Sequence, residues 1–223
     1  MSGGGIGVTQ RLILVRHGET DWNAEGRIQG MLDVPLNALG WQQATLVAEE
    51  LAQRIEVGAI VCSDLVRTRE TAKPLVDATG FPISFDARLR ERHFGVLQGK
   101  TYSEWRANDA AGIARYSAGD PDYGPEGGET ARGFLDRCVN AVTDLVIACD
   151  EKTLILVTHG GVVSSMYRHS QGLEFHSQRT WSVPNASISE WRVKFENDAP
   201  IFYCERIGDD AHVVAALDEV DGK

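Results

Sequence analysis

The stretch Arg11-Leu-Ile-Leu-Val-Arg-His-Gly-Glu19 sets a short, continuous apolar run directly against a group of polar residues. A continuous run of this length is typical of a strand that is buried on both faces, as in a parallel sheet. The same pattern returns in Thr153-Leu-Ile-Leu-Val-Thr-His-Gly-Gly161, and Ala59-Ile-Val-Cys62 stops at Ser63 and Asp64. The sequence therefore predicts three buried strands, each followed at once by polar or glycine residues.

Helical patterns separate these strands along the chain. Asn37 is suited to cap a helix over 38–54, Gly80 to end a helix over 66–79, and Thr130 to begin an amphipathic helix that reaches Cys149. Further strands are predicted over 83–86, 186–191 and 201–207, the last two near the edge of the sheet. Strands that alternate with helices around one core predict a three-layer α/β/α sandwich with a mainly parallel central sheet.

The length of 223 residues fits one large domain, which we place over 11–217. The glycine-rich stretch 1–10 is predicted to be a disordered leader and 218–223 a tail. Residues 102–128 hold many glycines and prolines, and we expect a short helix near 102–108 and otherwise an irregular excursion.

The composition excludes several classes of protein. A net charge of −10 argues against nucleic-acid partners and anionic membranes, and no apolar run approaches the ~20 residues that cross a bilayer. The first residues do not form a secretory signal. The cysteines show no CxxC spacing, so we expect buried free thiols in a cytoplasmic protein; they are Cys62, Cys138, Cys149 and Cys204.

Candidate functional residues follow the predicted strands. Ligands of parallel sheets bind at the carboxyl ends of the strands, where this chain has Arg16, His17 and His159, with Arg67 at the start of the next helix. Two buried histidines at one sheet edge are hard to explain by packing, because each imidazole needs partners for both nitrogens. Two arginines beside them predict a pocket for an anion, and phosphate is the anion that arginine geometry suits best.

The chain also resembles the histidine phosphatase superfamily, in particular its phosphoglycerate mutase-like branch. The resemblance is carried by blocks in family order: Leu14-Val-Arg-His-Gly-Glu-Thr-Asp-Trp-Asn23, Gly26-Arg-Ile-Gln-Gly30, Pro35-Leu-Asn-Ala-Leu-Gly40, Ser63-Asp-Leu-Val-Arg-Thr-Arg-Glu-Thr-Ala72, Leu89-Arg-Glu-Arg-His-Phe-Gly-Val-Leu-Gln-Gly99, Gly127-Gly-Glu-Thr130 and Val157-Thr-His-Gly-Gly161. A lone Arg-His-Gly is weak evidence, whereas all these blocks together identify a family.

The resemblance implies a phosphomonoester hydrolase that works through a phosphorylated histidine on a small phosphorylated metabolite, without a metal or another cofactor. It makes His17 the nucleophile and Glu91 the general acid and base. The phosphoryl oxygens would be bound by Arg16, Arg67 and His159, with Asn23, Gln29 and Gly160 close by. The chemistry is sound, because a neutral imidazole attacks phosphorus well and a protonated carboxyl can supply the proton that the leaving group needs.

Other interpretations remain open at this point. The local sequence around Glu91 favours a surface carboxylate paired with Arg90 or Arg92. His17 and His159 are also compatible with a metal hydrolase, although the adjacent arginines would repel a cation, and an inactive phosphate-binding module would keep the same pocket. The remaining residues of these types carry no further signal: His93 is expected to be structural or at the rim, Arg69 to point elsewhere, and His169, His176 and His212 to be packing or surface residues.

The main alternative is a 2,3-bisphosphoglycerate-dependent phosphoglycerate mutase, which shares the same core residues. The stretch 102–128 holds two basic and five acidic residues, a net charge of −3. We therefore expect a pocket mouth that weakens the capture of a bisphosphorylated intermediate and favours hydrolysis. Specificity is expected to lie in this excursion, with Tyr102, Trp105, Tyr116 and Tyr123 among its residues. The oligomeric state stays open.

Overall fold

The structure is a computed structural model that describes residues 9–56 and 58–221. Residues 1–8 of the predicted leader lie outside the described residues. Thr9 and Gln10, which were predicted to belong to that leader, form the start of the first strand instead.

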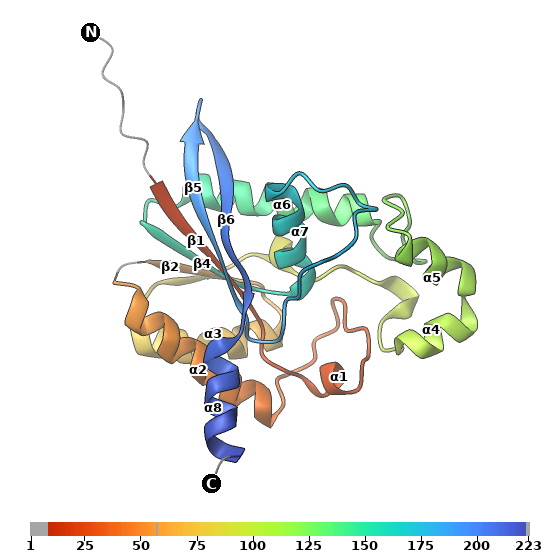
Figure 1. Cartoon of the computed structure of the whole chain (residues 1–223), viewed down its shortest axis with the longest axis horizontal. Helices are drawn as coiled ribbons and strands as arrows, with labels where there is room; N and C mark the ends of the chain where they lie inside the picture. The colour runs from red at the N-terminus through yellow and green to blue at the C-terminus, as the bar shows by residue number, and fades with distance from the viewer. Residues whose placement is uncertain (1–8, 57, 222–223) are drawn as a thin grey trace.

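The described residues contain one six-stranded sheet in the order β3-β2-β4-β1-β5-β6 (Figure 1). Its strands are β1 (Thr9–Arg16), β2 (Ala59–Cys62), β3 (Ile83–Phe85), β4 (Thr153–Thr158), β5 (Ile188–Glu196) and β6 (Ala199–Asp209). The first four are parallel to one another, whereas β5 and β6 are antiparallel to their neighbours. The predicted mainly parallel sheet is thus confirmed.

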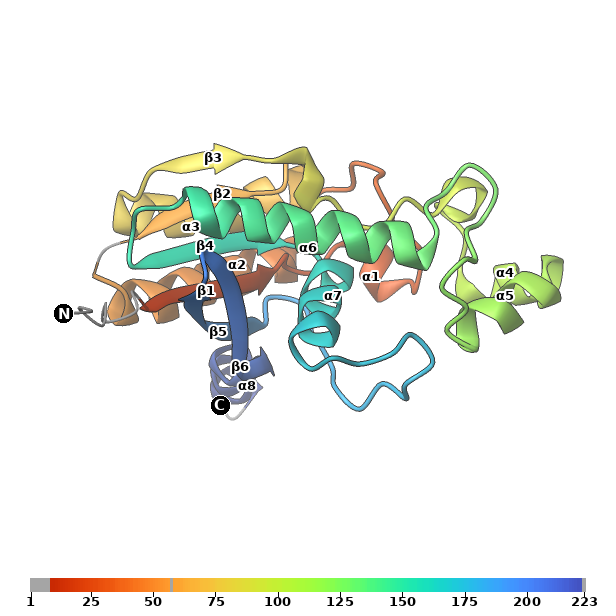
Figure 2. The same ribbon diagram turned by 90° about the horizontal axis from the view of Figure 1, so that it is seen from above.

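Helices cover both faces of this sheet (Figures 1 and 2). They are α1 (Asp21–Ala24), α2 (Ala38–Arg54), α3 (Val66–Thr79), α4 (Tyr102–Asn108), α5 (Ala110–Ser117), α6 (Ala131–Ala148), α7 (Gly160–Ser170) and α8 (Ala211–Asp221), with short 3₁₀ turns η1 (Ala87–Leu89) and η2 (Gly95–Leu97). The predicted helix ends are confirmed where a cap was recognised. Asn37 accepts a hydrogen bond from the Gly40 amide, Thr130 accepts one from Gly133, and Gly80 ends α3 with φ +67°.

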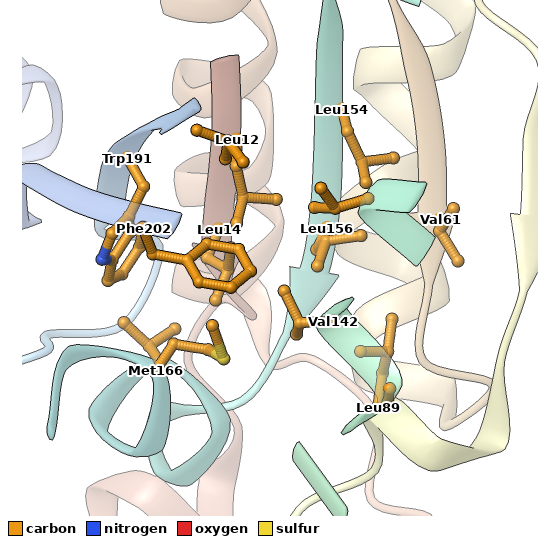
Figure 3. Packing of buried hydrophobic residues seen from close by; sticks show 14 of the residues in the cluster. Leu12, Leu14, Val61, Leu89, Val142, Leu154, Leu156, Met166, Trp191 and Phe202 are labelled. Carbon is orange, nitrogen blue, oxygen red and sulfur yellow. The ribbon is translucent and has the colours of Figure 1, made fainter. Parts of the chain in front are cut away.

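Strand β1 shows how the sheet holds the layers together. Leu12 and Leu14 face α6 and α7, where they pack with residues such as Val142 and Met166 (Figure 3). The alternate residues Ile13 and Val15 face the layer of α2, α3 and α8. Because both faces of the strand are covered, its sequence is continuously apolar.

The excursion is more ordered than predicted, because it holds α5 as well as the expected α4. Asp109 caps α5 by accepting a hydrogen bond from the Gly112 amide, so Gly112 lies in the first turn of a helix and does not break one. Both helices lie beyond the end of the sheet in the two views (Figures 1 and 2). They close over a small apolar cluster of Ile28, Leu97, Trp105, Ile113 and Tyr123.

Two further predictions near the C-terminus are corrected. Strands β5 and β6 are longer than expected, because Asn197 and Asp198 adopt positive φ and form a tight two-residue hairpin turn. Both strands lie near the sheet edge as predicted, with β6 at the edge and β5 between β6 and β1. Helix α8 was not predicted; its Val213 packs on the core, and the helix extends to Asp221, into the predicted tail.

The four cysteines are free thiols, and two of them depart from the prediction of burial. Cys62 and Cys138 are buried, whereas Cys149 at the end of α6 and Cys204 on the edge strand are half-buried. Within residues 9–56 and 58–221, none of the helices combines the length and apolar character that a bilayer crossing requires.

Candidate active site

The two predicted histidines meet at the carboxyl edge of the sheet. Arg16 and Thr158 are partners in the register of the neighbouring parallel strands β1 and β4, so the residues that follow them lie at the same level. The rings of His17 and His159 lie edge to face, with their centroids 5.3 Å apart. Arg67, from the first turn of α3, is fully buried beside them.

His17 is held in one orientation and one tautomer. Its Nδ1 lies 2.7 Å from the carbonyl oxygen of Gly18, and because a carbonyl only accepts, Nδ1 carries the hydrogen. The neutral ring then has its lone pair on Nε2. Burial, followed by the charges of Arg67 and Arg16, holds the pKa of His17 well below its usual range. The imidazole is therefore neutral at neutral pH, which is the form that can act as a nucleophile.

His159 is fully buried and equally neutral. Its Nε2 lies 2.9 Å from the hydroxyl oxygen of Ser63, the residue that follows β2. Burial and the charge of Arg67 hold the pKa of His159 well below its usual range. Its Nδ1 is buried and has no hydrogen-bond partner within the described part of the chain, which is a costly state unless a ligand supplies one.

The guanidinium groups of Arg16 and Arg67 are anchored by backbone carbonyls. Arg16 Nη1 donates to Val183 at 2.6 Å, and Arg67 donates to Leu32 and Gly30 at 2.8 and 2.7 Å. The Nε of each is buried without a partner among the described residues. Burial lowers the pKa of both, that of Arg67 to about 10. Two such cations, without an ion-pair partner in the described part of the chain, fit a site that takes up an anion.

Glu91 does not form the surface ion pair that its local sequence favours. Its Oε2 accepts a hydrogen bond from the Gly161 amide at 2.9 Å, and its Oε1 accepts one from the Arg92 amide at 2.8 Å. Arg90 pairs with Asp64 instead, and both carboxylate oxygens of Asp64 accept from its guanidinium group. The carboxyl group of Glu91 thus lies in the cavity, next to the start of α7.

The other predicted binding residues line the same cavity. Asn23 uses its Oδ1 to accept hydrogen bonds from Thr20 and from Asn185, and Gln29 is buried with its Oε1 unpartnered among the described residues. Gly160 lies against the guanidinium of Arg16, where an added Cβ would sit 3.3 Å from Nε.

The cavity has a volume of about 830 Å³, toward the upper end of the range that small-molecule pockets span. Three tyrosines of the excursion line it: Tyr102, Tyr116 and Tyr123. Trp105 is buried in the small apolar cluster of the excursion, to which Tyr123 also belongs. His176 also lines the cavity, although its sequence context carried no signal.

The net charge at the cavity mouth was predicted with the wrong sign. The excursion contributes one charged residue to the lining, Asp120, and Arg115 pairs with it. The last turn of α7 contributes Arg168 and the segment after α7 contributes Arg179, and neither residue was predicted from the sequence. The charged residues of the lining are six arginines against two acids: Arg16, Arg27, Arg67, Arg92, Arg168, Arg179, Glu91 and Asp120.

Asn185 is a second residue that the sequence did not reveal. Its Nδ2 donates to the carbonyls of His17 and Gly18 and to Asn23 Oδ1, at 3.1 to 3.2 Å. The side chain thus ties the loop after β1 to the segment before β5, more than 160 residues away in sequence. No local sequence pattern predicts a contact between residues so far apart in the chain.

The remaining candidates lie elsewhere. Arg69 stacks over the ring of Phe85, and His93 accepts a hydrogen bond from the Gly95 amide. His169 contacts the ring of Phe202, and His212 approaches the carbonyl of Ala186. Across residues 9–56 and 58–221, no group of three or more His, Cys, Asp or Glu side chains is arranged to hold a metal ion.

Gly161→Ala tests whether the position of Glu91 matters. An added Cβ would sit 2.1 Å from Glu91 Oε1 and 3.0 Å from the ring of Phe134, so the carboxyl group must move. We expect kcat to fall by about 10²-fold, because a displacement of about 1 Å in a reacting group costs that much. Steady-state kinetics checks this, and Gly133→Ala on α6, whose Cβ would meet only Thr130 Oγ1 at 3.2 Å, is the matched control. Native activity in Gly161→Ala would contradict a role for this contact.

Comparison with known proteins identifies the family. The family model of the histidine phosphatase superfamily (branch 1) matches residues 12–206. A glucosyl-3-phosphoglycerate phosphatase of Mycolicibacterium vanbaalenii is 41% identical over 172 residues, which cover 74% of this chain and 75% of that one. A protein of Citrobacter koseri named probable phosphoglycerate mutase GpmB is 37% identical over 214 residues, which cover 94% of this chain and 98% of that one.

A comparison with solved structures also identifies similar proteins. The solved structure of Bacillus stearothermophilus YhfR matches this structure with a TM-score of 0.83 at 30% identity, over 92% of this chain and 99% of that one. The resemblance inferred from the motif blocks and the predicted α/β fold are both confirmed.

Proposed function

The chain belongs to branch 1 of the histidine phosphatase superfamily and is an enzyme of that superfamily, and from this premise we propose that it hydrolyses a small phosphomonoester through a phosphorylated His17. One observation carries the proposal: the neutral imidazole of His17, with its lone pair on Nε2, lines the same cavity as Arg16 and Arg67, each of which has a buried Nε without a partner among the described residues. An anion drawn to these arginines would be in reach of the nucleophile.

The proposed reaction has two steps. Nε2 of His17 attacks phosphorus, the ester P–O bond breaks, and the leaving oxygen takes a proton from Glu91. Water then attacks the phosphorus of phospho-His17 and gives its proton to Glu91, the P–N bond breaks, and inorganic phosphate leaves. Glu91 regains in the second step the proton that it gave in the first, and His17 loses the phosphoryl group that it had accepted, so the enzyme returns to its starting state.

The surrounding residues would stabilise the charge of the transferred group. In phosphoryl transfer the negative charge is spread over three equatorial oxygens, and catalysis is mainly positioning and electrostatic stabilisation. Arg16, Arg67 and His159 each have a buried nitrogen that could donate to the transferred group. His159 is not itself part of the cavity lining, whereas Asn23, Gln29 and Gly160 are. Because these donors are already held by the backbone, little reorganisation is needed when the charge develops.

A phosphoglycerate mutase is the second candidate. Arg168 and Arg179 favour it, since a mutase must hold a bisphosphorylated intermediate by a second set of cations. The size of the cavity favours hydrolysis, because about 830 Å³ admits a larger leaving group than a three-carbon acid and leaves space for water beside His17.

The two candidates are separated by following products. We expect the enzyme to release phosphate from at least one member of a panel of phosphomonoesters and to interconvert 3- and 2-phosphoglycerate slowly or not at all. The measurement supplies 3-phosphoglycerate with and without 2,3-bisphosphoglycerate and compares 2-phosphoglycerate with free phosphate. Isomerisation that is stimulated by the bisphosphate and faster than hydrolysis of every monoester would establish the mutase and overturn the proposal.

Activity is expected to be independent of divalent metal ions. Arg16, Arg67 and His159 supply the kind of charge stabilisation that Mg²⁺ supplies in other phosphoryl-transfer enzymes. After dialysis against EDTA the rate of phosphate release should stay within about twofold of the native rate, since no charge needed for the transition state is removed. A loss of activity that a divalent ion restores would count against the proposed chemistry.

A further inference from the structure

Two arginines form a second cationic group on the cavity wall, on elements other than those that carry Arg16 and Arg67. Arg168 lies in the last turn of α7, and Arg179 lies in the segment that leads to β5. Both line the cavity, and both guanidinium groups lie over the ring of Trp181, at 5.4 and 5.7 Å from its centroid. The indole is largely buried, so it fixes where the two cations lie.

Neither arginine is neutralised by the protein. Arg168 donates to the carbonyl of Glu174 and Arg179 donates to the carbonyl of Trp181, and these neutral acceptors leave both charges uncompensated. Among residues 9–56 and 58–221, no carboxylate lies within ion-pair distance of either group. Arg115 and Arg132 near the same end of the molecule do pair, with Asp120 and Asp122.

The other arginines of the lining are committed elsewhere. Arg27 pairs with Glu25 and Glu104. Arg92 is buried and donates to the carbonyls of Glu129 and Tyr123. Like Arg168 and Arg179, Arg92 donates to carbonyls only, but it is buried and makes three such hydrogen bonds, whereas each of the other two makes one. Beyond the pair assigned to the phosphoryl group, Arg168 and Arg179 are thus the cations of the described lining with the fewest partners.

The two charges also act on each other and on the phosphate site. Burial and then the neighbouring Arg179 lower the pKa of Arg168. Arg179 also contributes, after burial, to the lowered pKa of Arg16. Like charges that are close enough to disfavour one another are relieved when an anion binds between them.

We propose that Arg168 and Arg179 form a subsite for a second anionic group of the substrate, so that the preferred substrates are phosphomonoesters whose leaving group carries a carboxylate or a second phosphate. The proposal rests on the proposed function, because it takes the scissile phosphoryl group to lie at His17. The contact between the two arginines and the distal anion exists in the bound substrate and also in the transition state. It therefore strengthens binding uniformly and should act on KM more than on kcat.

A matched pair of substrates tests the subsite. 4-Carboxyphenyl phosphate carries the distal anion, and 4-carbamoylphenyl phosphate replaces it with a neutral amide of nearly the same shape. In the double variant Arg168→Gln/Arg179→Gln, kcat/KM for the carboxylate compound should fall about 10- to 100-fold, as expected for the loss of charge-assisted hydrogen bonds. For the amide compound the change should stay within about threefold, since no such bond is lost.

Two further variants separate charge from structure. Arg106→Gln removes an exposed arginine that lies outside the cavity and has no carboxylate partner among the described residues, and it should leave both rates unchanged. Arg168→Lys/Arg179→Lys keeps both charges and should retain more of the preference for the carboxylate than the glutamine variant does.

Equal losses of kcat/KM on both compounds in the glutamine variant would show that the arginines have only a structural role. An unchanged kcat/KM for the carboxylate compound would show that they do not contact the substrate. Either result overturns the subsite while phosphate release by the native enzyme upholds the proposed function. If the native enzyme releases phosphate from neither compound, the panel of phosphomonoesters still decides the proposed function, and calorimetric binding of 4-carboxyphenyl phosphate decides the subsite. It stands if the glutamine variant binds at least about tenfold more weakly, and it falls if binding is unchanged.

Discussion

Replacing His17 with alanine is expected to lower kcat by at least about 10⁴-fold, because the reaction loses its nucleophile and not merely a binding group. The variant should still fold, since the site is at the edge of the sheet and the core of β1 is untouched. Phosphate release from a phosphomonoester, followed over hours at high enzyme concentration, is the measurement.

His169→Ala is the matched control, because this histidine contacts Phe202 outside the cavity and should keep the native rate. Retention of the native rate in His17→Ala would eliminate the covalent mechanism. A general loss in both variants would point to instability of the fold instead.

Glu91→Gln has the second-largest expected effect, a decrease in kcat of about 10²- to 10⁴-fold for an alkyl phosphate. The leaving alkoxide needs a proton that an amide cannot give. Glutamine also offers only one oxygen, so either the Gly161 amide or the Arg92 amide loses its acceptor, and the side chain shifts.

Substrates with different leaving groups distinguish the loss of the proton donor from a displacement of the side chain. 4-Nitrophenolate leaves without a proton, so 4-nitrophenyl phosphate should suffer much less than the alkyl phosphate if Glu91 acts as the acid. A shift of the side chain alone would lower both rates by the same factor, and that outcome would reject the acid role.

The parallel centre of the sheet could be predicted because β1, β2 and β4 contain short, continuous apolar runs that end abruptly in polar residues. The convergence of His17, His159, Arg16 and Arg67 followed from the rule that parallel strands share one carboxyl edge. Helix boundaries could be predicted where a cap is local, as at Asn37 and Thr130.

The errors share one physical cause, which is that the deciding contacts are not local. Around Glu91 the neighbouring arginines suggested an ion pair, yet its partner is the Gly161 amide, 70 residues away. Arg168 from the last turn of α7 and Arg179 from the segment after it both line the cavity, and no periodic sequence pattern predicts that placement. The charge count over 102–128 failed for the same reason, since the opposite wall supplies the cations.

The central claim is that His17 carries the phosphoryl group, and trapping it is the most direct test. The native enzyme is mixed with a substrate labelled in the phosphoryl group, quenched in alkali within milliseconds, digested, and mapped by mass spectrometry. The account predicts one phosphorylated peptide that spans His17, with a label that survives base, is lost in acid, and is absent from His17→Ala. A labelled peptide elsewhere in the chain, or full turnover with no labelled peptide at any time, would contradict it.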